Sequence, residues 1–319
     1  MRLGILAAVL ATTTGLHAAE PVPFESRDSA DTPERFRLAS HTFEAESSPW
    51  LDLAQSGIEV RKVRFPSPVT SKYPVNNTVH GEYFVPKGMA GKRPAVLVLD
   101  ILDGSARVSR GEALWLAQHG IPAFVMYLPH YGPRRQANDR VRMLMPDIEH
   151  STAAVRQAVL DSRRAVAWLA QQPGVDPSRV GVVGTSLGSF MAGLTAAAEP
   201  RLESACLLLT GGGLVDALQD HPQAKQIVNA VRLLGITPEG VRKIVDPLDP
   251  LTYARQMSGR RLLFVVATRD DVVPPSAGER LWKATGEQKI VRVNATHVGA
   301  VLYAAQGMNA IVEHITAAK

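Results

Sequence analysis

The sequence predicts an α/β protein with a mostly parallel central sheet and helices on both faces. From residue 94 onward, short apolar runs alternate with longer amphipathic stretches, as strands and covering helices do in parallel sheets. Before residue 94, two stretches alternate apolar with charged residues, which is typical of strands with one exposed face. The 319 residues are 45% hydrophobic, which is enough to build one large core.

The first 19 residues have the pattern of a secretory signal peptide. Arg2 precedes an apolar block over residues 3–10, and small residues follow as far as Ala18 and Ala19. The block is too short to span a membrane, and no later apolar run is long enough to do so. We therefore expect removal of residues 1–19 and a secreted or periplasmic protein without a stable membrane span.

The elements of the remaining chain are predicted from hydrophobic periodicity. Residues 20–57 are polar and contain prolines, so we expect an irregular N-terminal arm before a main domain over 58–319. Alternation predicts antiparallel strands at 58–65 and 75–86. Nearly continuous apolar runs predict buried strands at 94–102, 121–129, 179–184, 203–211 and 260–268, and a further strand is expected at 288–295.

Helical spacing fills the gaps between these strands. The predicted helices cover residues 110–120, 152–172, 187–198, 276–285 and 300–317. Residues 214–257 break the alternation, because two or three helical segments follow one another there before the next strand. This pattern predicts a small helical cap inserted at the ends of the strands.

Composition excludes several classes of partner. The net charge is +5, but the basic residues are scattered, so no nucleic-acid partner is expected. Cys206 is the single cysteine and lies in an apolar run, so we expect a buried packing residue and no disulfide within the chain. Apart from His297, considered below, the histidines lack metal-ligand spacing, and neither a metal nor another cofactor is expected.

Reactive side chains follow three of the predicted strands. Ligands of such sheets bind at the carboxyl ends of the strands. Ser186 follows the strand at 179–184, Asp270 and Asp271 follow the one at 260–268, and His297 follows the one at 288–295. Their order along the chain is serine, aspartate, histidine.

A compact turn surrounds the serine. Residues 184–188 read Gly-Thr-Ser-Leu-Gly, between a predicted strand and a predicted helix. A sharp turn there would lift the Ser186 hydroxyl clear of the sheet at the expense of a strained backbone, and Gly184 and Gly188 would let the strand and helix pack closely. The helix that begins at Leu187 would direct backbone N–H groups at the space above Ser186, where they could stabilise an oxyanion.

These motifs resemble those of the α/β-hydrolase family, over most of the chain from about residue 58. The resemblance is carried by residues 184–188, by TRDDVVPP at 268–275 and by ATHVGAVLY at 295–303. Residues 119–135 and 249–254 also resemble segments of exported bacterial members related to dienelactone hydrolases and acetyl xylan esterases. The family resemblance implies an α/β-hydrolase fold and a serine esterase type of site.

The resemblance also implies catalytic roles. Ser186 would be the nucleophile, and His297 the general base that later protonates the leaving group. The family's acid is followed by two residues and then Val-Pro, which places it at Asp270, with Asp271 as the alternative. Asp216 occupies a position where some members carry another acid. Activity should rise as His297 loses its proton.

Other parts of the site are implied less directly. One oxyanion donor would be the N–H of Leu187, and the second should come from the loop after the strand at 94–102. The family often has His-Gly there, whereas this chain has Asp-Ile-Leu-Asp-Gly at 100–104. Position favours the N–H of Leu102, with Ile101 as the alternative. Tyr131 and Arg134 could line the substrate pocket, although a salt-bridged structural loop explains them equally well.

The favoured function is a serine carboxylic-ester hydrolase acting on a small-molecule or polymer-linked ester. An acyltransferase or a peptidase or amidase would use the same three groups, and a non-catalytic binding protein could share the scaffold. A dinucleotide oxidoreductase is disfavoured because the turn at 184–188 lacks the Gly-x-Gly-x-x-Gly pattern. Neither the identity of the ester nor the oligomeric state is predicted.

Overall fold

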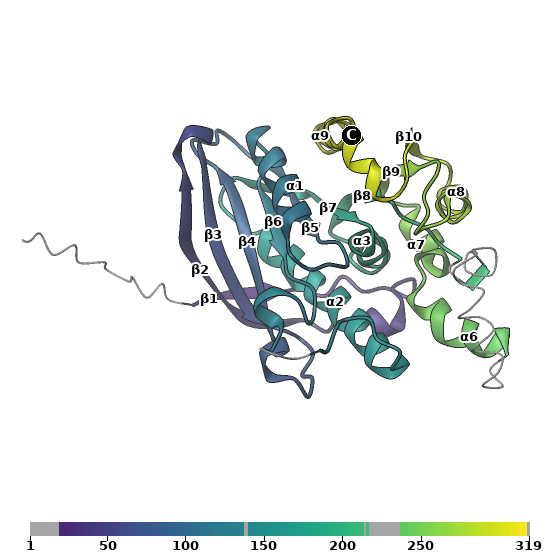
Figure 1. Cartoon of the computed structure of the whole chain (residues 1–319). Coiled ribbons are helices and arrows are strands. Elements are labelled where there is room, and N and C mark those ends of the chain that lie inside the picture. The colour runs from purple at the N-terminus through teal and green to yellow at the C-terminus, as the bar shows by residue number, and fades with distance from the viewer. Residues whose placement is uncertain (1–18, 137–139, 214, 217–236, 318–319) are drawn as a thin grey trace, which may run out of the picture.

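The computed structural model describes residues 19–136, 140–213, 215–216 and 237–317. Within these ranges, ten strands form one sheet in the order β1-β2-β3-β4-β6-β5-β7-β8-β9-β10 (Figure 1). The first strands in sequence lie at one edge of the sheet and the last strand at the other. The predicted fold class, a mostly parallel sheet with antiparallel N-terminal strands, is confirmed.

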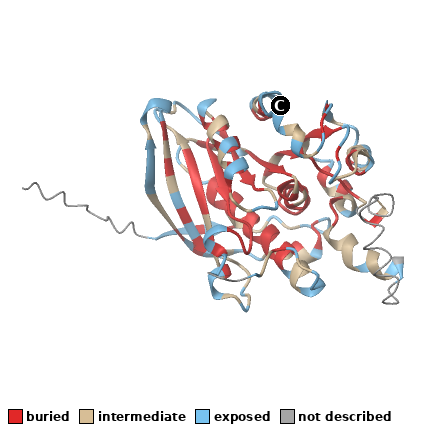
Figure 2. Cartoon of the chain, viewed as in Figure 1, coloured by how far each residue is buried: buried red, intermediate tan, exposed pale blue. Residues whose placement is uncertain are grey.

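The parallel half of the sheet carries the strands that were predicted as apolar runs. Neighbouring strands in this half pair in parallel. It consists of β5 (Arg93–Leu99), β6 (Ala123–Met126), β7 (Val175–Thr185), β8 (Leu202–Leu208), β9 (Arg261–Ala267) and β10 (Lys289–Val293). Helices cover both faces of β5 to β9, so these strands are almost wholly buried, as Figure 2 shows.

The antiparallel half is longer than the sequence indicated. It comprises β1 (Glu20–Phe24), β2 (His41–Leu53), β3 (Ile58–Pro66) and β4 (Thr78–Pro86). The expectation of an irregular arm over 20–57 is therefore wrong for much of that range. On β2, Phe43 and Ala45 are buried while their neighbours are exposed or half-buried, so the polar composition reflects a half-exposed strand. Its pairing with β3 shifts register between Pro49 and Leu51.

Helices form a layer on each face of the sheet. α1 (Arg107–Gln118) and α9 (Ala304–Thr316) pack into one apolar layer, whereas α2 (Ile148–Leu169), α3 (Leu187–Ala198) and α8 (Pro275–Ala284) pack into the other. Short 3-10 helices join the elements: η1 (Glu34–Phe36), η2 (Ala54–Ser56), η3 (Pro74–Asn77), η4 (Gly132–Arg134), η5 (Asp246–Leu248), η6 (Pro250–Tyr253) and η7 (Val298–Tyr303).

The predicted cap over 214–257 is described in part. Residues 214 and 217–236 lie outside the described residues. The remainder of the insertion contains α6 (Pro238–Val245) and α7 (Ala254–Met257), between β8 and β9. Helical segments thus occupy the described part of the insertion, as predicted. None of the described helices is long and apolar enough to cross a membrane.

Candidate active site

Ser186 lies at the turn between β7 and α3. Its backbone has φ 52° and ψ −120°, a region that residues with a Cβ rarely enter. The strain is held by the surrounding structure, because the Ser186 N–H donates to the carbonyl of Leu208 on β8 at 2.9 Å. The sharp, strained turn predicted from the Gly-x-Ser-x-Gly pentad is therefore present.

The two glycines of the pentad allow the elements to approach closely. A Cβ on Gly184 would lie 2.1 Å from the carbonyl oxygen of Gly188, and one on Gly188 would lie 2.1 Å from the carbonyl oxygen of Leu99. Neither position can therefore accept a side chain without movement of the backbone. The second contact also brings the end of β5 against the start of α3, so the loop after β5 begins next to the Ser186 turn.

Three side chains from distant parts of the chain meet above this turn. His297 Nε2 lies 3.0 Å from Ser186 Oγ, and His297 Nδ1 lies 2.8 and 2.9 Å from the two carboxylate oxygens of Asp270. These distances are those of hydrogen bonds. Since Nδ1 faces a carboxylate, it is the nitrogen that carries a proton in neutral imidazole, and Nε2 is then the acceptor that faces the hydroxyl.

The two neighbouring aspartates hold different parts of this arrangement. Asp270 Oδ1 also accepts the N–H groups of Val272 and Val273 at 2.9 and 2.8 Å, which fixes the carboxylate in its turn. Asp271 Oδ1 accepts the backbone N–H of His297 at 3.1 Å. Asp270 therefore contacts the imidazole ring, whereas Asp271 fixes the backbone that carries it.

Solvent reaches the carboxylate less than the ring. The side chain of Asp270 is 3% exposed and that of His297 12% exposed. A shielded carboxylate interacts more strongly with a charge that develops on the imidazole, because little water screens the pair. The arrangement is able to take a proton from Ser186 and to stabilise the imidazolium that results.

Comparisons with solved structures identify the fold. The structure is similar to the acetyl xylan esterase from Paenibacillus sp. R4, with a TM-score of 0.70 and 20% identity over 84% of this chain and 88% of that one. It is also similar to acetyl xylan esterase 1 from Thermoanaerobacterium sp. JW/SL YS485, with a TM-score of 0.64 and 19% identity over 85% and 87% of the two chains. The chain has the α/β-hydrolase fold.

Other proteins match at lower similarity or over less of the chain. The Pyrococcus furiosus esterase Pf2001 matches with a TM-score of 0.56 and 14% identity over 84% of this chain and 96% of that one. Residues 154–295 match the model of the prolyl oligopeptidase family. Two uncharacterized proteins of Mycobacterium tuberculosis, from strains CDC 1551 and H37Rv, are 30% identical over 184 residues. That match covers 56% of this chain and 43% of theirs.

The backbone N–H groups of Leu187 and Leu102, the predicted oxyanion donors, have no hydrogen-bond acceptor among the described residues. Leu187 begins α3 directly after the Ser186 turn, and Leu102 lies in the loop after β5. The choice between Leu102 and Ile101, the alternative donor, stays a prediction.

Arg134 does not line a pocket. Its side chain is fully buried and forms an ion pair with Asp161 on α2 at 2.7 Å. It also donates to the carbonyls of Tyr127 and Asn76. The expectation that Arg134 contacts substrate is therefore wrong, because its side chain is fully buried in the core. A buried Arg that loses such partners would leave unpaired charge in the core.

Tyr131 packs against the loop after β5 without reaching solvent. It is 5% exposed, and a Cβ on Gly104 would lie 2.1 Å from its ring. Its hydroxyl has no hydrogen-bond partner among the described residues, and burial raises its pKa to about 12. The Tyr131 ring thus packs against the loop that carries Leu102. That Tyr131 lines a substrate pocket stays a prediction.

Two further predicted residues lie outside the triad. Asp216 forms an ion pair with Arg242 on α6, and this pair lowers the pKa of its carboxyl. The Asp216 carboxylate therefore pairs with Arg242 and not with the His297 imidazole. Cys206 is fully buried on β8, as predicted. Among the described residues, no group of three histidine, cysteine, aspartate or glutamate side chains is placed to hold a metal ion.

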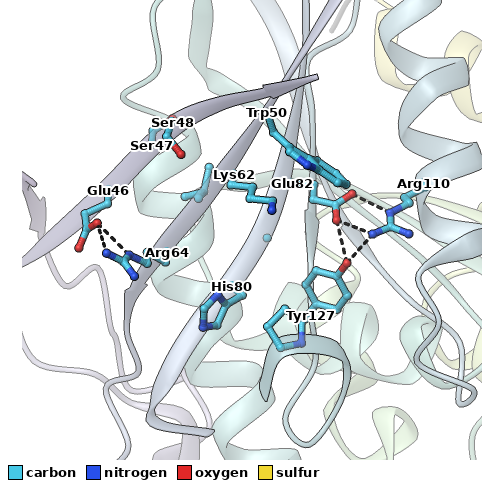
Figure 3. Close-up of a pocket in the computed structure, with 13 residues that line it drawn as sticks. Glu46, Ser47, Ser48, Trp50, Lys62, Arg64, His80, Glu82, Arg110 and Tyr127 are labelled. Atoms are coloured by element: carbon cyan, nitrogen blue, oxygen red, sulfur yellow. Dashed lines mark hydrogen bonds and ion pairs between the residues drawn. The ribbon is translucent and has the colours of Figure 1, made fainter. Parts of the chain in front are cut away.

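One cavity lies away from Ser186, Asp270 and His297. A cavity of about 630 Å³ opens over β2, β3 and β4 beside the start of α1 (Figure 3). Its wall is a network in which Arg110 and the Tyr127 hydroxyl both bind the buried Glu82 carboxylate. Its lining contains none of Ser186, Asp270 and His297.

Sequence reasoning missed two carboxyl groups close to the turn. Asp100 directly follows β5, and Glu112 lies on the inner side of α1, and both are buried. Glu112 accepts a hydrogen bond from Thr185, the residue before Ser186. A single acidic residue inside an amphipathic helix carries no signal in sequence, because the pattern does not show that its side chain meets a polar group across the sheet.

Proposed function

We propose that the protein is a serine hydrolase that cleaves carboxylic esters through an acyl-enzyme intermediate. The observation that carries this proposal is the chain of contacts from the Asp270 carboxylate to His297 and from His297 Nε2 to Ser186 Oγ, at 2.8–3.0 Å. A serine hydroxyl becomes a useful nucleophile only when a positioned base removes its proton, and this arrangement provides that base.

The first half of the reaction forms the acyl-enzyme. His297 Nε2 takes the hydroxyl proton while Ser186 Oγ attacks the ester carbonyl, and the carbonyl oxygen becomes an oxyanion. The N–H groups of Leu187 and Leu102 stabilise that oxyanion. The tetrahedral intermediate then collapses, His297 gives its proton to the leaving alcohol oxygen, and the C–O bond of the ester breaks.

The second half releases the acid. A water molecule gives a proton to His297 Nε2 and attacks the acyl carbonyl, which again passes through an oxyanion. His297 returns the proton to Ser186 Oγ as the acyl C–O bond breaks. Throughout both halves, Asp270 keeps the ring in the required tautomer and stabilises its charged form, because it binds Nδ1.

The comparisons support a hydrolase that acts on esters but do not identify the leaving group. The solved structures cited above are named as esterases, which favours an ester bond of a small molecule or a polymer. The match of residues 154–295 to the prolyl oligopeptidase family favours an amide bond as the second candidate. An acyltransferase differs only in the acceptor, since an alcohol replaces water.

We also propose that the mature protein is secreted or periplasmic. The support is the apolar block at 3–10, after Arg2 and before the small residues up to Ala19. Expression of the full chain in a bacterium, with the N-terminus of the purified product determined by mass spectrometry, tests this. An N-terminus that still includes residues 1–19 in the exported fraction would contradict it.

Covalent labelling tests the enzyme class. A fluorophosphonate probe should label the wild-type protein and fail to label Ser186→Ala, while Ser48→Ala, at the cavity away from the triad, should label normally. p-Nitrophenyl esters of increasing acyl length and peptide p-nitroanilides, assayed in parallel, distinguish an esterase from a peptidase. Loss of Ser186 should lower kcat by roughly 10⁶-fold. Equal labelling of wild type and Ser186→Ala would sink the proposal.

A further inference from the structure

A buried carboxyl group contacts the residue that directly precedes Ser186. Glu112 lies on the inner side of α1, and its Oε1 accepts a hydrogen bond from Thr185 Oγ1 at 2.5 Å. Glu112 is 7% exposed and Thr185 9%. Since Thr185 directly precedes Ser186, this contact fixes the last residue of β7 immediately before the backbone enters its strained conformation.

A second buried carboxyl group contacts the loop that carries Leu102. Asp100 Oδ2 accepts the N–H of Ala106 at 2.7 Å, and Oδ1 accepts the N–H of Ser109 at 3.4 Å. Ala106 has φ +59°, an unusual conformation for a residue with a Cβ. The carboxylate therefore ties the end of β5 to the far end of the loop that carries Leu102 and to the start of α1.

We propose that Asp100 and Glu112 are positioning residues that fix the two backbone donors of the proposed oxyanion hole relative to one another. Asp100 acts through the loop that carries Leu102, and Glu112 acts through Thr185 at the turn that leads to Leu187. This inference rests on the proposed hydrolase function. It adds two residues to the reaction that neither contact the substrate nor belong to the triad.

The start of α1 connects the two carboxyl groups. Ser109, which binds Asp100, and Glu112, which binds Thr185, are one helical turn apart on α1. A helical turn is a stiff spacer, so the loop after β5 and the turn after β7 are held by a common element. Oxyanion stabilisation depends on donors at about 2.7–3.1 Å from the oxygen, so a small shift of either donor lowers the rate.

The surroundings of Glu112 favour its neutral form. The ionisable groups that face it are the Asp100 carboxyl at the end of β5 and the Cys206 thiol on β8. α9 and β6 contribute apolar side chains to the same layer, among them Met308, Ile311 and Val125. Glu82, on β4, is directed instead to Arg110. No cation among the described residues pairs with Glu112.

The positioning role therefore requires the protonated form of Glu112. Burial, together with the nearby Asp100 charge, raises the pKa of Glu112 to about 7, and burial also raises the pKa of Asp100. Glu112 Oε2 has no hydrogen-bond partner among the described residues, which leaves a site for the proton. A negative charge there, next to the turn that leads to Leu187, would oppose the negative charge of the oxyanion.

Four variants test the proposal through the pH profile of kcat on a p-nitrophenyl ester. Glu112→Gln keeps the shape and the contact with Thr185 but does not ionise, so kcat below pH 6 should stay within about twofold of wild type, and a wild-type decline above pH 7 should be absent. Thr185→Val and Asp100→Asn should each lower kcat by roughly 10-fold or more, with little change in KM.

Glu82→Gln is the matched control. It changes a carboxyl group of similar burial that also contacts α1 but faces the cavity. It should lower the unfolding midpoint while the shape of the pH profile stays that of wild type. A merely structural role for Glu112 would give Glu112→Gln this same outcome, with an unchanged pH profile, and would overturn the inference.

The experiments distinguish failure of this inference from failure of the proposed function. If Ser186→Ala abolishes turnover but Glu112→Gln has the wild-type pH profile, the enzyme stands and the positioning role of Glu112 fails. If Asp100→Asn and Thr185→Val retain wild-type kcat, the inference fails as a whole. If fluorophosphonate does not label Ser186 in the folded protein, the proposed function itself fails.

Discussion

Two polar regions of the molecule use carboxylates in opposite ways. At the cavity over β2 to β4, Glu82 binds Arg110 and Glu46 binds Arg64, so each carboxylate meets a permanent cation (Figure 3). At the carboxyl ends of β7, β9 and β10, Asp270 meets an imidazole, which can gain or lose a proton and whose other nitrogen reaches Ser186.

The two kinds of partner differ in whether they can transfer a proton. A guanidinium stays charged at every physiological pH, so the pairs at the cavity cannot transfer a proton. A histidine can gain or lose a proton near neutral pH while the protein stays folded, so the contact with Asp270 can serve a reaction. The partner of each carboxylate therefore distinguishes the two regions.

The largest expected effect comes from replacing the carboxylate that contacts the ring. Asp270→Asn should lower kcat by roughly 10⁴-fold, because an amide can donate to Nδ1 and so favours the wrong tautomer. Asp271→Asn should cost roughly tenfold or less, because Asp271 binds the backbone N–H of His297 and not its ring. Steady-state kinetics on one p-nitrophenyl ester measures both. Similar losses in the two variants would show that Asp270 has no special role.

The pH dependence of stability should reveal the buried Glu112. Its pKa in the folded state, about 7, exceeds the reference value of 4.5, so the folded protein keeps a proton that the unfolded chain releases. This stability is fully present below about pH 4.5 and is lost as pH rises through about 7, by about 3 kcal/mol in all. Urea unfolding between pH 5 and 8 should show a smaller decline for Glu112→Gln than for wild type. Parallel declines would contradict it.

The smallest effect is expected at the cavity. Glu82→Gln should lower the free energy of unfolding by about 2 kcal/mol, because Arg110 loses a charged partner but is itself partly exposed to water. Activity per folded molecule should not change. A double-mutant cycle of Glu82→Gln with Arg110→Met, followed by urea unfolding, isolates the pair. A coupling energy near zero would mean that Glu82 contributes through Tyr127 instead.

The sequence anticipated the fold where hydrophobic patterning is strong. The strands β5 to β9 are short apolar runs, and their ends carry the residues that the structure brings together. The pattern failed at β1 and β2, because an edge region with one exposed face has a composition like that of a loop. Periodicity there is weakened by polar side chains and by the register shift at Pro49.

Side-chain partners were less predictable than strand positions. Arg134 and Asp161 are 27 residues apart and meet in the core, although each lies in a segment whose pattern does not indicate a partner. The same holds for Thr185 and Glu112, which are 73 residues apart. Contacts of this kind depend on how a helix rotates and translates over a sheet, which residue types alone do not specify.

The sequence by itself determined the order of strands and helices from β3 onward and the spacing of Ser186, Asp270 and His297 after three strands, since local periodicity and turn chemistry act over a few residues. Only the tertiary structure decided that Asp270 contacts the imidazole while Asp271 holds its backbone. It also decided that Glu112 contacts Thr185, directly before the Ser186 turn. Such choices depend on distances of a few tenths of an ångström between elements far apart in the chain, and close packing sets those distances.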